Sequence, residues 1–188
     1  TINVTGNVTM DNTRTDMGDA TWTVSGNFDN YHVTTFNRNA STLVMNGTAK
    51  SLTSAGSTKP LHALNIASGA SITASSQSSG VRAYYVTISG SLYIDGYSAR
   101  LEVVAGTLSI NDGGSMTGHS CKVLSGAVIS SMAGNISVVT LIFENAGVTP
   151  LVAGTYSAQN VAFYTYSSIA RTLKFPSGDI YFDGTGDV

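Results

Sequence analysis

The sequence predicts an all-β protein, a parallel β-helix (β-solenoid), on three observations. Segments of alternating polarity recur behind glycines at Gly69, Gly90, Gly106 and Gly126, which lie 21, 16 and 20 positions apart. No stretch has apolar residues at sustained helical spacing, because serine and glycine interrupt each candidate. Connections are too short for crossover helices, which a stacked coil does not need. At about 20 residues per coil, the 188 residues predict about nine coils.

The composition limits the classes of partner. Charged residues make up 11% of the chain, and nine Lys and Arg against eleven Asp and Glu give a net charge of −2. This argues against a nucleic-acid partner, which requires a basic surface. No apolar run approaches the roughly 20 residues of a membrane-spanning helix. Cys121 is the single cysteine, and we expect it to be a small buried apolar residue rather than a reactive thiol.

The first 20 residues predict one strand followed by a loop. Residues 1–10 alternate apolar and polar side chains, and residues 11–20 hold three acidic groups and read as a loop. The chain begins at Thr1, without an initiator Met, so we expect either a removed leader or a segment of a longer protein. Residues 1–20 are expected to be the first strand of the domain or a strand exchanged with a neighbouring subunit.

The middle of the chain predicts short strands separated by turns. Trp22, Val24 and Phe28 are expected to point inward, and Asn46-Gly47 predicts a turn. Further strands are predicted at 62–66, 71–73, 84–88, 91–94, 101–104, 107–110, 121–124, 127–129 and 135–139. The continuously apolar run from Val138 to Phe143 predicts a strand that is covered on both faces.

Residues 1–188 are expected to form a single domain. Residues 150–188 keep the alternation but are richer in aromatic residues, which predicts further coils or a closing cap. The two ends of a solenoid present unpaired backbone groups. Since the sequence offers no amphipathic helix to cover them, we expect another subunit, or more of the same polypeptide, to do so.

Residues 22–114, about half of the chain, carry a family resemblance. The segments WTVSGNFDN, STLVMNGT, LHALNIASG, GSLYI and GTLSI resemble the repeat units of large extracellular β-solenoid surface proteins of bacteria and archaea and of related viral fibre proteins. The resemblance implies a structural or adhesive role outside the cell, at a cell surface or on a virion. The chain departs from the pattern at residues 57–60 and in the tyrosine-rich stretch from Ala83 to Tyr97, where bulges or loops are expected.

No catalytic motif is present. The three histidines, His32, His62 and His119, have no metal-ligand spacing, and there is no G-x-S-x-G elbow or phosphate-binding glycine loop. Solenoids also host glycan-degrading enzymes, which need clustered carboxylates. Glu102, Asp112 and Glu144 fall in separate predicted coils, although side chains of different coils can meet on one face. We therefore assign no catalytic residue, cofactor or metal ligand and predict that the protein is not an enzyme.

Several weaker patterns remain open. Asp179, Asp183 and Asp187 are calcium candidates, but Asp-Gly turns explain them more simply. Glycosylation triplets begin at Asn3, Asn7, Asn39, Asn46 and Asn135. Tyrosines gather at Tyr84, Tyr85, Tyr93 and Tyr97 and at Tyr164 and Tyr166. These tyrosines predict either a surface for glycans or a subunit interface; the alternative is that they pack in the core or at its rim.

The sequence thus predicts a non-enzymatic extracellular subunit of a filament, surface layer or virion fibre. Its partners would be copies of itself, joined by coil stacking or strand exchange. The alternative function is a carbohydrate-binding or adhesive module that contacts surface glycans. The alternative fold is an immunoglobulin-like β-sandwich, since short strands at regular spacing fit that architecture as well.

Overall fold

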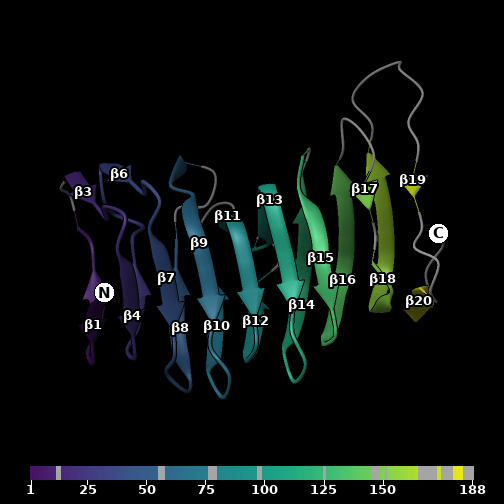
Figure 1. Cartoon of the computed structure of the whole chain (residues 1–188), viewed down its shortest axis with the longest axis horizontal. Helices are drawn as coiled ribbons and strands as arrows, with labels where there is room; N and C mark the ends of the chain where they lie inside the picture. Colours follow the sequence, from purple (N-terminus) through teal and green to yellow (C-terminus); the bar gives the residue numbers. More distant parts are fainter. Residues whose placement is uncertain are drawn as a thin grey trace.

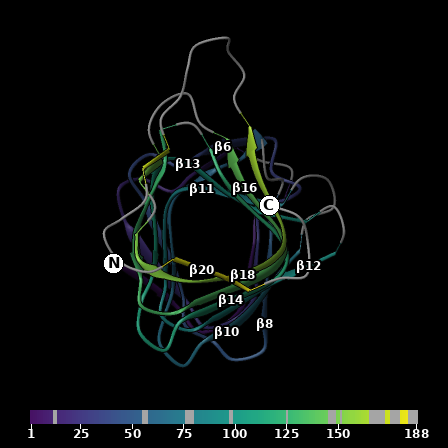
Figure 2. The same ribbon diagram turned by 90° about the vertical axis from the view of Figure 1, so that its right-hand side faces the viewer.

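The chain winds into one rod of short strands (Figure 1). The computed structural model describes residues 1–11, 14–54, 58–75, 80–96, 99–124, 126–144, 149–150, 152–164, 173–174 and 180–183. These residues contain strands and no α-helix. Viewed along the rod, the strands surround a single axis (Figure 2), so each coil lies on the preceding one.

Each coil passes through up to three faces. Face 1 contains β1 (Ile2–Val4), β4 (Thr21–Val24), β7 (Thr42–Met45), β9 (Leu61–Ile66), the second halves of β11 (Val81–Ile88) and β13 (Leu101–Ile110), and β15 (Val128–Met132). Face 2 contains β2 (Val8–Thr9), β5 (Phe28–Asp29), β8 (Lys50–Thr53), β10 (Ser71–Ser75), β12 (Ser91–Asp95), the first halves of β14 (Ser115–Val123), β16 (Asn135–Glu144) and β18 (Gly154–Tyr164), and β20 (Ile180–Asp183). Face 3 contains β3 (Arg14–Asp16), β6 (Thr35–Asn37) and the remaining halves of β11, β13, β14, β16 and β18, which bend around a corner. Two short strands, β17 (Thr149–Pro150) and β19 (Leu173–Lys174), pair with each other.

The parallel β-solenoid predicted from the sequence is confirmed. Neighbouring strands of all three faces pair in parallel, whereas an immunoglobulin-like sandwich requires antiparallel pairs, so that alternative is wrong. In face 1, Ile2 pairs with Trp22, and the ladder continues through Leu43, Leu64 and Val86, steps of 20, 21, 21 and 22 residues. These steps match the predicted period of about 20 residues.

Face 1 accounts for about seven turns, whereas the ladder of face 2 contains nine strands in the described chain, and the sequence-based estimate was about nine coils. The estimate divided the whole chain by a constant period. In the structure Ser91 pairs with Ser115, a step of 24 residues, and Gly154 pairs with Ile180, a step of 26. The period is therefore not constant along the rod.

The glycine repeat that pointed to the solenoid joins segments of different faces. Leu92, in the segment led by Gly90, pairs with Ile72 and Met116 in face 2. Leu108, in the segment led by Gly106, pairs with Val86 and Ile129 in face 1. The spacing of 16 residues between Gly90 and Gly106 is therefore not one coil. The interpretation of these two segments as successive copies is wrong, although the period it suggested is close to the true one.

The core is a set of vertical columns of apolar side chains. Leu43, Leu64, Val86 and Leu108 follow one another in face 1, and each is at most 1% exposed. Cys121 belongs to such a column in face 3, between Leu101 and Leu141. Burial raises the pKa of the Cys121 thiol from 9.0 to about 12, so the thiol is protonated at neutral pH. The prediction that Cys121 is a buried apolar residue is confirmed.

Two local predictions are wrong. Residues 11–20 include β3, which pairs with β6, where a loop was predicted. The hydrogen bonds of β3 come from a coil about 20 residues further on, which no local pattern reveals. The run from Val138 to Phe143 has one inner face only, since Val138, Leu141 and Phe143 are buried while Val139 and Ile142 are half-buried.

The two ends of the chain extend the same coil. Residues 1–20 form its first turn, because β1 and β2 pair with β4 and β5 of the same chain. In the C-terminal region, β18 pairs with β16 and β20 pairs with β18. The predicted irregularity between Ala83 and Tyr97 is confirmed, because the register between β11 and β13 shifts between Ala83 and Tyr85.

Candidate functional sites: the N-terminal edge and an aromatic corner

The N-terminal end of the rod is an edge that is paired on one side only. Its three strands, β1, β2 and β3, pair with β4, β5 and β6 respectively and with no other strand of the described chain. Neither β1 nor β2 carries a charged residue or a proline. Charges, prolines and bulges are the usual protection of an exposed edge, so β1 and β2 are unprotected.

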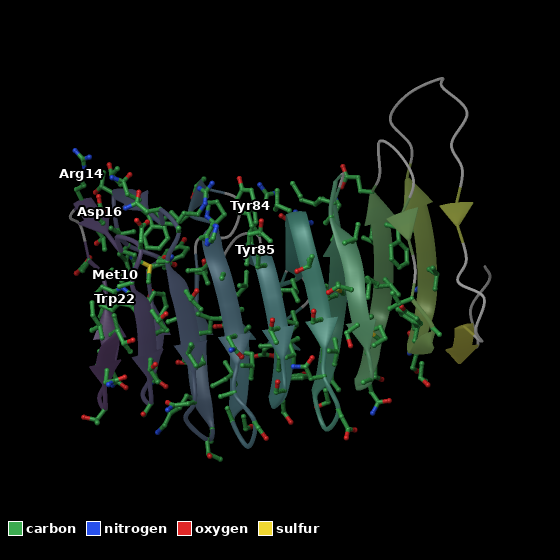
Figure 3. All side chains as sticks on the ribbon, viewed as in Figure 1. Met10, Arg14, Asp16, Trp22, Tyr84 and Tyr85 are labelled. Atoms are coloured by element: carbon green, nitrogen blue, oxygen red, sulfur yellow. The ribbon has the colours of Figure 1, made fainter. Side chains whose placement is uncertain are left out.

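Apolar side chains are left partly exposed at this edge. Ile2 is 39% exposed, and Val4 and Val8 are half-buried. Their counterparts one coil further, Val24 and Phe28, are completely buried. Trp22, in the column of Ile2, is only half-buried and lies near the same end of the rod (Figure 3). The columns of the core thus continue up to the edge and stop there without a cover.

A column of glycines lies at the corner where face 1 turns into face 2, which we call the glycine corner. A Cβ atom added to any of them would lie 2.1–2.3 Å from a carbonyl oxygen of the preceding coil; these glycines are Gly26, Gly47, Gly90, Gly114 and Gly134. None of the five has a left-handed backbone. They are glycines because consecutive coils approach too closely for a side chain.

The same corner carries an asparagine hydrogen bond from coil to coil. The N–H of Asn27 donates to Oδ1 of Asn7, and the N–H of Ser51 donates to Oδ1 of Asn27, both at 2.9 Å. Each asparagine side chain therefore accepts a hydrogen bond from the backbone of the following coil. The backbone N–H groups of Asn27 and Ser51 are thereby paired within the turn.

A second candidate site is the aromatic corner, which we define as Arg38, His62, Tyr84 and Tyr85. The register shift in β11 turns both tyrosines outward, since Ala83 and Val86 on either side of them are completely buried. Figure 3 shows the tyrosines next to each other on the rod. A Cβ atom added to Gly106 in the next coil would lie 2.0 Å from the carbonyl oxygen of Tyr84 and 3.3 Å from Cδ1 of Tyr85. The lack of a side chain at Gly106 thus leaves room first for the backbone of Tyr84 and also for the ring of Tyr85.

Contacts with earlier coils hold the two rings in place. Tyr85, which is 45% exposed, packs edge-on against His62 with ring centroids 5.2 Å apart. The guanidinium carbon of Arg38 lies 4.4 Å from the ring centroid of Tyr84, a cation–π contact. Nδ1 of His62 is buried without a hydrogen-bond partner among the described residues. The corner is thus a preformed aromatic surface with basic side chains beside it.

A shallow hollow of about 260 Å³ adjoins the aromatic corner. It is lined by Phe36, Asn37, Arg38 and Asn39. Nδ2 of Asn39 donates to Oδ1 of Asp16. Arg38 belongs to both the hollow and the aromatic corner, so the two features form one continuous surface with amide and guanidinium donors.

A charge ladder crosses face 3, where Arg82, Glu102 and Lys122 are in register on successive coils. Glu102 is 1% exposed; its Oε2 accepts a hydrogen bond from Nε of Arg82 at 2.6 Å, and its Oε1 forms an ion pair with Nε of Arg100 at 2.6 Å. Glu144 pairs with Lys122. The structure thus brings Glu102 and Glu144 to the same face, but each is neutralised by a basic side chain. Asp112 is exposed elsewhere, in the turn that follows β13.

The remaining residues singled out in the sequence do not come together. His32 is exposed and packs against Tyr31, His62 lies in the aromatic corner and His119 is half-buried in β14. Within the described ranges, no three His, Cys, Asp or Glu side chains gather as metal ligands would. Asp179, Asp187, Tyr97 and Tyr166 lie outside the described residues, and only the backbone of Asp183 and Tyr164 is described. The five glycosylation triplets begin at exposed asparagines.

The tyrosine cluster expected from the sequence is divided between two faces. Tyr84 and Tyr85 lie where face 3 turns into face 1, whereas Tyr93 is 48% exposed on face 2 between Thr73 and Thr117. No local pattern pointed to Arg38 and His62, because they come from coils about 45 and about 20 residues earlier, respectively. Once the length of each coil is known, counting back one and two coils from Tyr84 places His62 and Arg38 in the aromatic corner.

The fold and these surfaces define the chain as a member of the β-solenoid class. Comparison of the chain with protein-family models, with curated proteins and with solved structures found no match. No helix in the described part of the chain is long and apolar enough to cross a membrane.

Proposed function

We propose that the protein is a non-enzymatic structural subunit that assembles by coil stacking outside the cell, in a filament, a surface layer or a virion fibre. The observation that carries this proposal is the N-terminal edge, at which β1 and β2 carry no charge or proline. There, Ile2, Val4 and Val8 are exposed or half-buried, whereas Val24 and Phe28, which follow Val4 and Val8 in their columns, are completely buried. The extracellular location rests on the resemblance of residues 22–114 to surface and fibre repeats.

The chemistry of the side chains supports a structural role over catalysis. Glu102 and Glu144 are paired with arginine and lysine, so neither is free to act as a general acid or nucleophile. The completely apolar columns and the glycine corner stabilise stacking of one coil on another. A solenoid of this kind is stabilised by each additional coil, because each interface buries further apolar surface.

Assembly is tested with the purified chain of 188 residues. Sedimentation velocity across a hundredfold range of concentration is expected to show association that grows with concentration. Electron microscopy of the concentrated sample is expected to show rods longer than one molecule. Dispersed single molecules at every concentration would contradict the proposal.

The aromatic corner favours a second candidate function, binding of a saccharide. A sugar ring offers a flat C–H face and a rim of hydroxyl groups. Tyr85 provides an exposed aromatic surface that His62 holds in place. Arg38, Asn37 and Asn39 provide hydrogen-bond donors beside it. Tyr85 is the one large apolar side chain of this corner that is exposed, so the surface suits a small polar ligand better than a protein partner.

This second function is tested on an array of immobilised oligosaccharides. Tyr85→Ala is expected to weaken binding of a retained glycan at least about tenfold, or 1.4 kcal/mol, because it removes the stacking surface. Tyr93→Ala is the matched control, since Tyr93 is equally exposed but lies on face 2. Equal losses in both variants, or no retained glycan for the unchanged protein, would rule the site out.

A further inference from the structure

We propose that the N-terminal edge receives β20 of a second copy of this chain, in a head-to-tail stack, and that Gly6 is the residue that admits this contact. This inference rests on the assembly proposed above and specifies its geometry. It predicts which edge takes part and in which direction the copies are joined. It also predicts that a side chain introduced at Gly6 prevents the contact.

Gly6 is a glycine that its own chain does not require. It occupies the position in the first coil that Gly26 occupies in the second, because Val4 pairs with Val24 and Val8 pairs with Phe28. A Cβ atom on Gly26 would lie 2.3 Å from the carbonyl oxygen of Gly6. A Cβ atom on Gly6 would meet nothing within 4 Å, and the backbone of Gly6 is not left-handed. Neither sterics nor backbone conformation within the molecule therefore explains the glycine.

The glycine at position 6 is explained if another coil lies against the N-terminal edge. In the glycine corner, the space of each missing side chain is filled by a carbonyl group of the preceding coil. The equivalent space at Gly6 opens toward the free edge, so a carbonyl group of an added coil fits there. The backbone N–H of Asn7 supports this geometry. Its equivalent in the next coil, the N–H of Asn27, donates to the preceding coil, whereas the described residues offer the N–H of Asn7 no such acceptor.

A second copy provides the matching edge at its other end. The ladder of face 2 begins with β2 and ends with β20, and within the described chain each of these strands pairs on one side only. All strands of the ladder run in the same direction. Placing β20 of one copy against β2 of the next therefore continues the parallel ladder, whereas a head-to-head contact would join two like edges in antiparallel fashion. A head-to-tail contact repeats without closing and produces a filament.

The test compares self-association of the unchanged chain with that of Gly6→Val, Gly6→Ala and Tyr93→Ala, by sedimentation velocity and electron microscopy. Gly6→Val is expected to require at least a tenfold higher concentration to associate, because its side chain occupies the space for the incoming carbonyl group. Gly6→Ala is expected to have the same effect to a smaller degree. Both variants are expected to keep the circular dichroism spectrum and the thermal midpoint of the dilute unchanged protein, since nothing in the molecule touches that Cβ position.

Tyr93→Ala separates end-to-end stacking from side-by-side association. Tyr93 lies on the outer surface of face 2, away from the edge, so this variant is expected to associate like the unchanged chain. If the unchanged chain associates and the Gly6 variants associate equally well, the role of Gly6 is refuted while assembly itself stands. If Tyr93→Ala abolishes association, the copies pack side by side and the head-to-tail stack is refuted. If the unchanged chain stays monomeric, the proposed function fails as well.

Discussion

Replacing Gly26 by alanine is expected to lower the free energy of unfolding by about 2–3 kcal/mol, although alanine adds a single methyl group. The added Cβ would lie 2.3 Å from the carbonyl oxygen and 2.4 Å from the carbonyl carbon of Gly6. Both are backbone atoms, so the two coils must move apart and the neighbouring hydrogen bond from Asn27 to Asn7 is strained. Thermal denaturation should show a midpoint lowered by about 5–10 °C.

Gly6→Ala is the matched control for this prediction. Both glycines precede an asparagine and an apolar residue, and neither has a left-handed backbone. Measured at a concentration at which the chain is monomeric, Gly6→Ala should change stability by no more than about 0.5 kcal/mol. Equal destabilisation by the two substitutions would show that loss of glycine flexibility, and not the close approach of the coils, causes the effect.

Replacing Glu102 by glutamine is expected to destabilise the protein by about 2–4 kcal/mol. The carboxylate is 1% exposed and neutralises both Arg82 and Arg100. Without its charge, the two guanidinium groups repel each other across a buried amide. Arg82 and Arg100 are 26% and 39% exposed, so they can turn partly toward water, which keeps the loss below that of a completely buried triad. Urea denaturation of the monomer measures the change.

Glu144→Gln is the control, because the side chain of Glu144 is 19% exposed against 1% for Glu102, and it pairs with one basic residue, Lys122. Its loss of stability should be smaller than that of Glu102→Gln, because water reaches the carboxylate of Glu144 more readily and screens its charge. If the two glutamine variants lose equal stability, burial of Glu102 does not determine the strength of its network. If neither loses stability, the charge ladder of face 3 contributes nothing to the fold.

The candidate sites were predicted less completely than the fold. Stacking alone implies that the two ends of a solenoid carry unpaired backbone groups, so the need for a cover was predictable from the sequence. Tyr84 and Tyr85 were recognised as a pair, but their neighbours Arg38 and His62 were not, because these come from other coils. Tyr93 was grouped with them by proximity in sequence and lies on a different face. Nearness in sequence is a poor guide here, because the side chains that surround a residue of a solenoid belong largely to other coils.

The sequence by itself determined the fold class and the approximate period. Alternating polarity marks strands with one inner face, and frequent glycines with short connections exclude helices, so both signals are local in the chain. Only the tertiary structure decided which segments lie on which face, that Gly90 and Gly106 belong to different corners, and that residues 14–16 form a strand. The reason is physical: the hydrogen bonds and close approaches that set the register join residues 20 to 26 positions apart, and their geometry depends on how the whole coil closes.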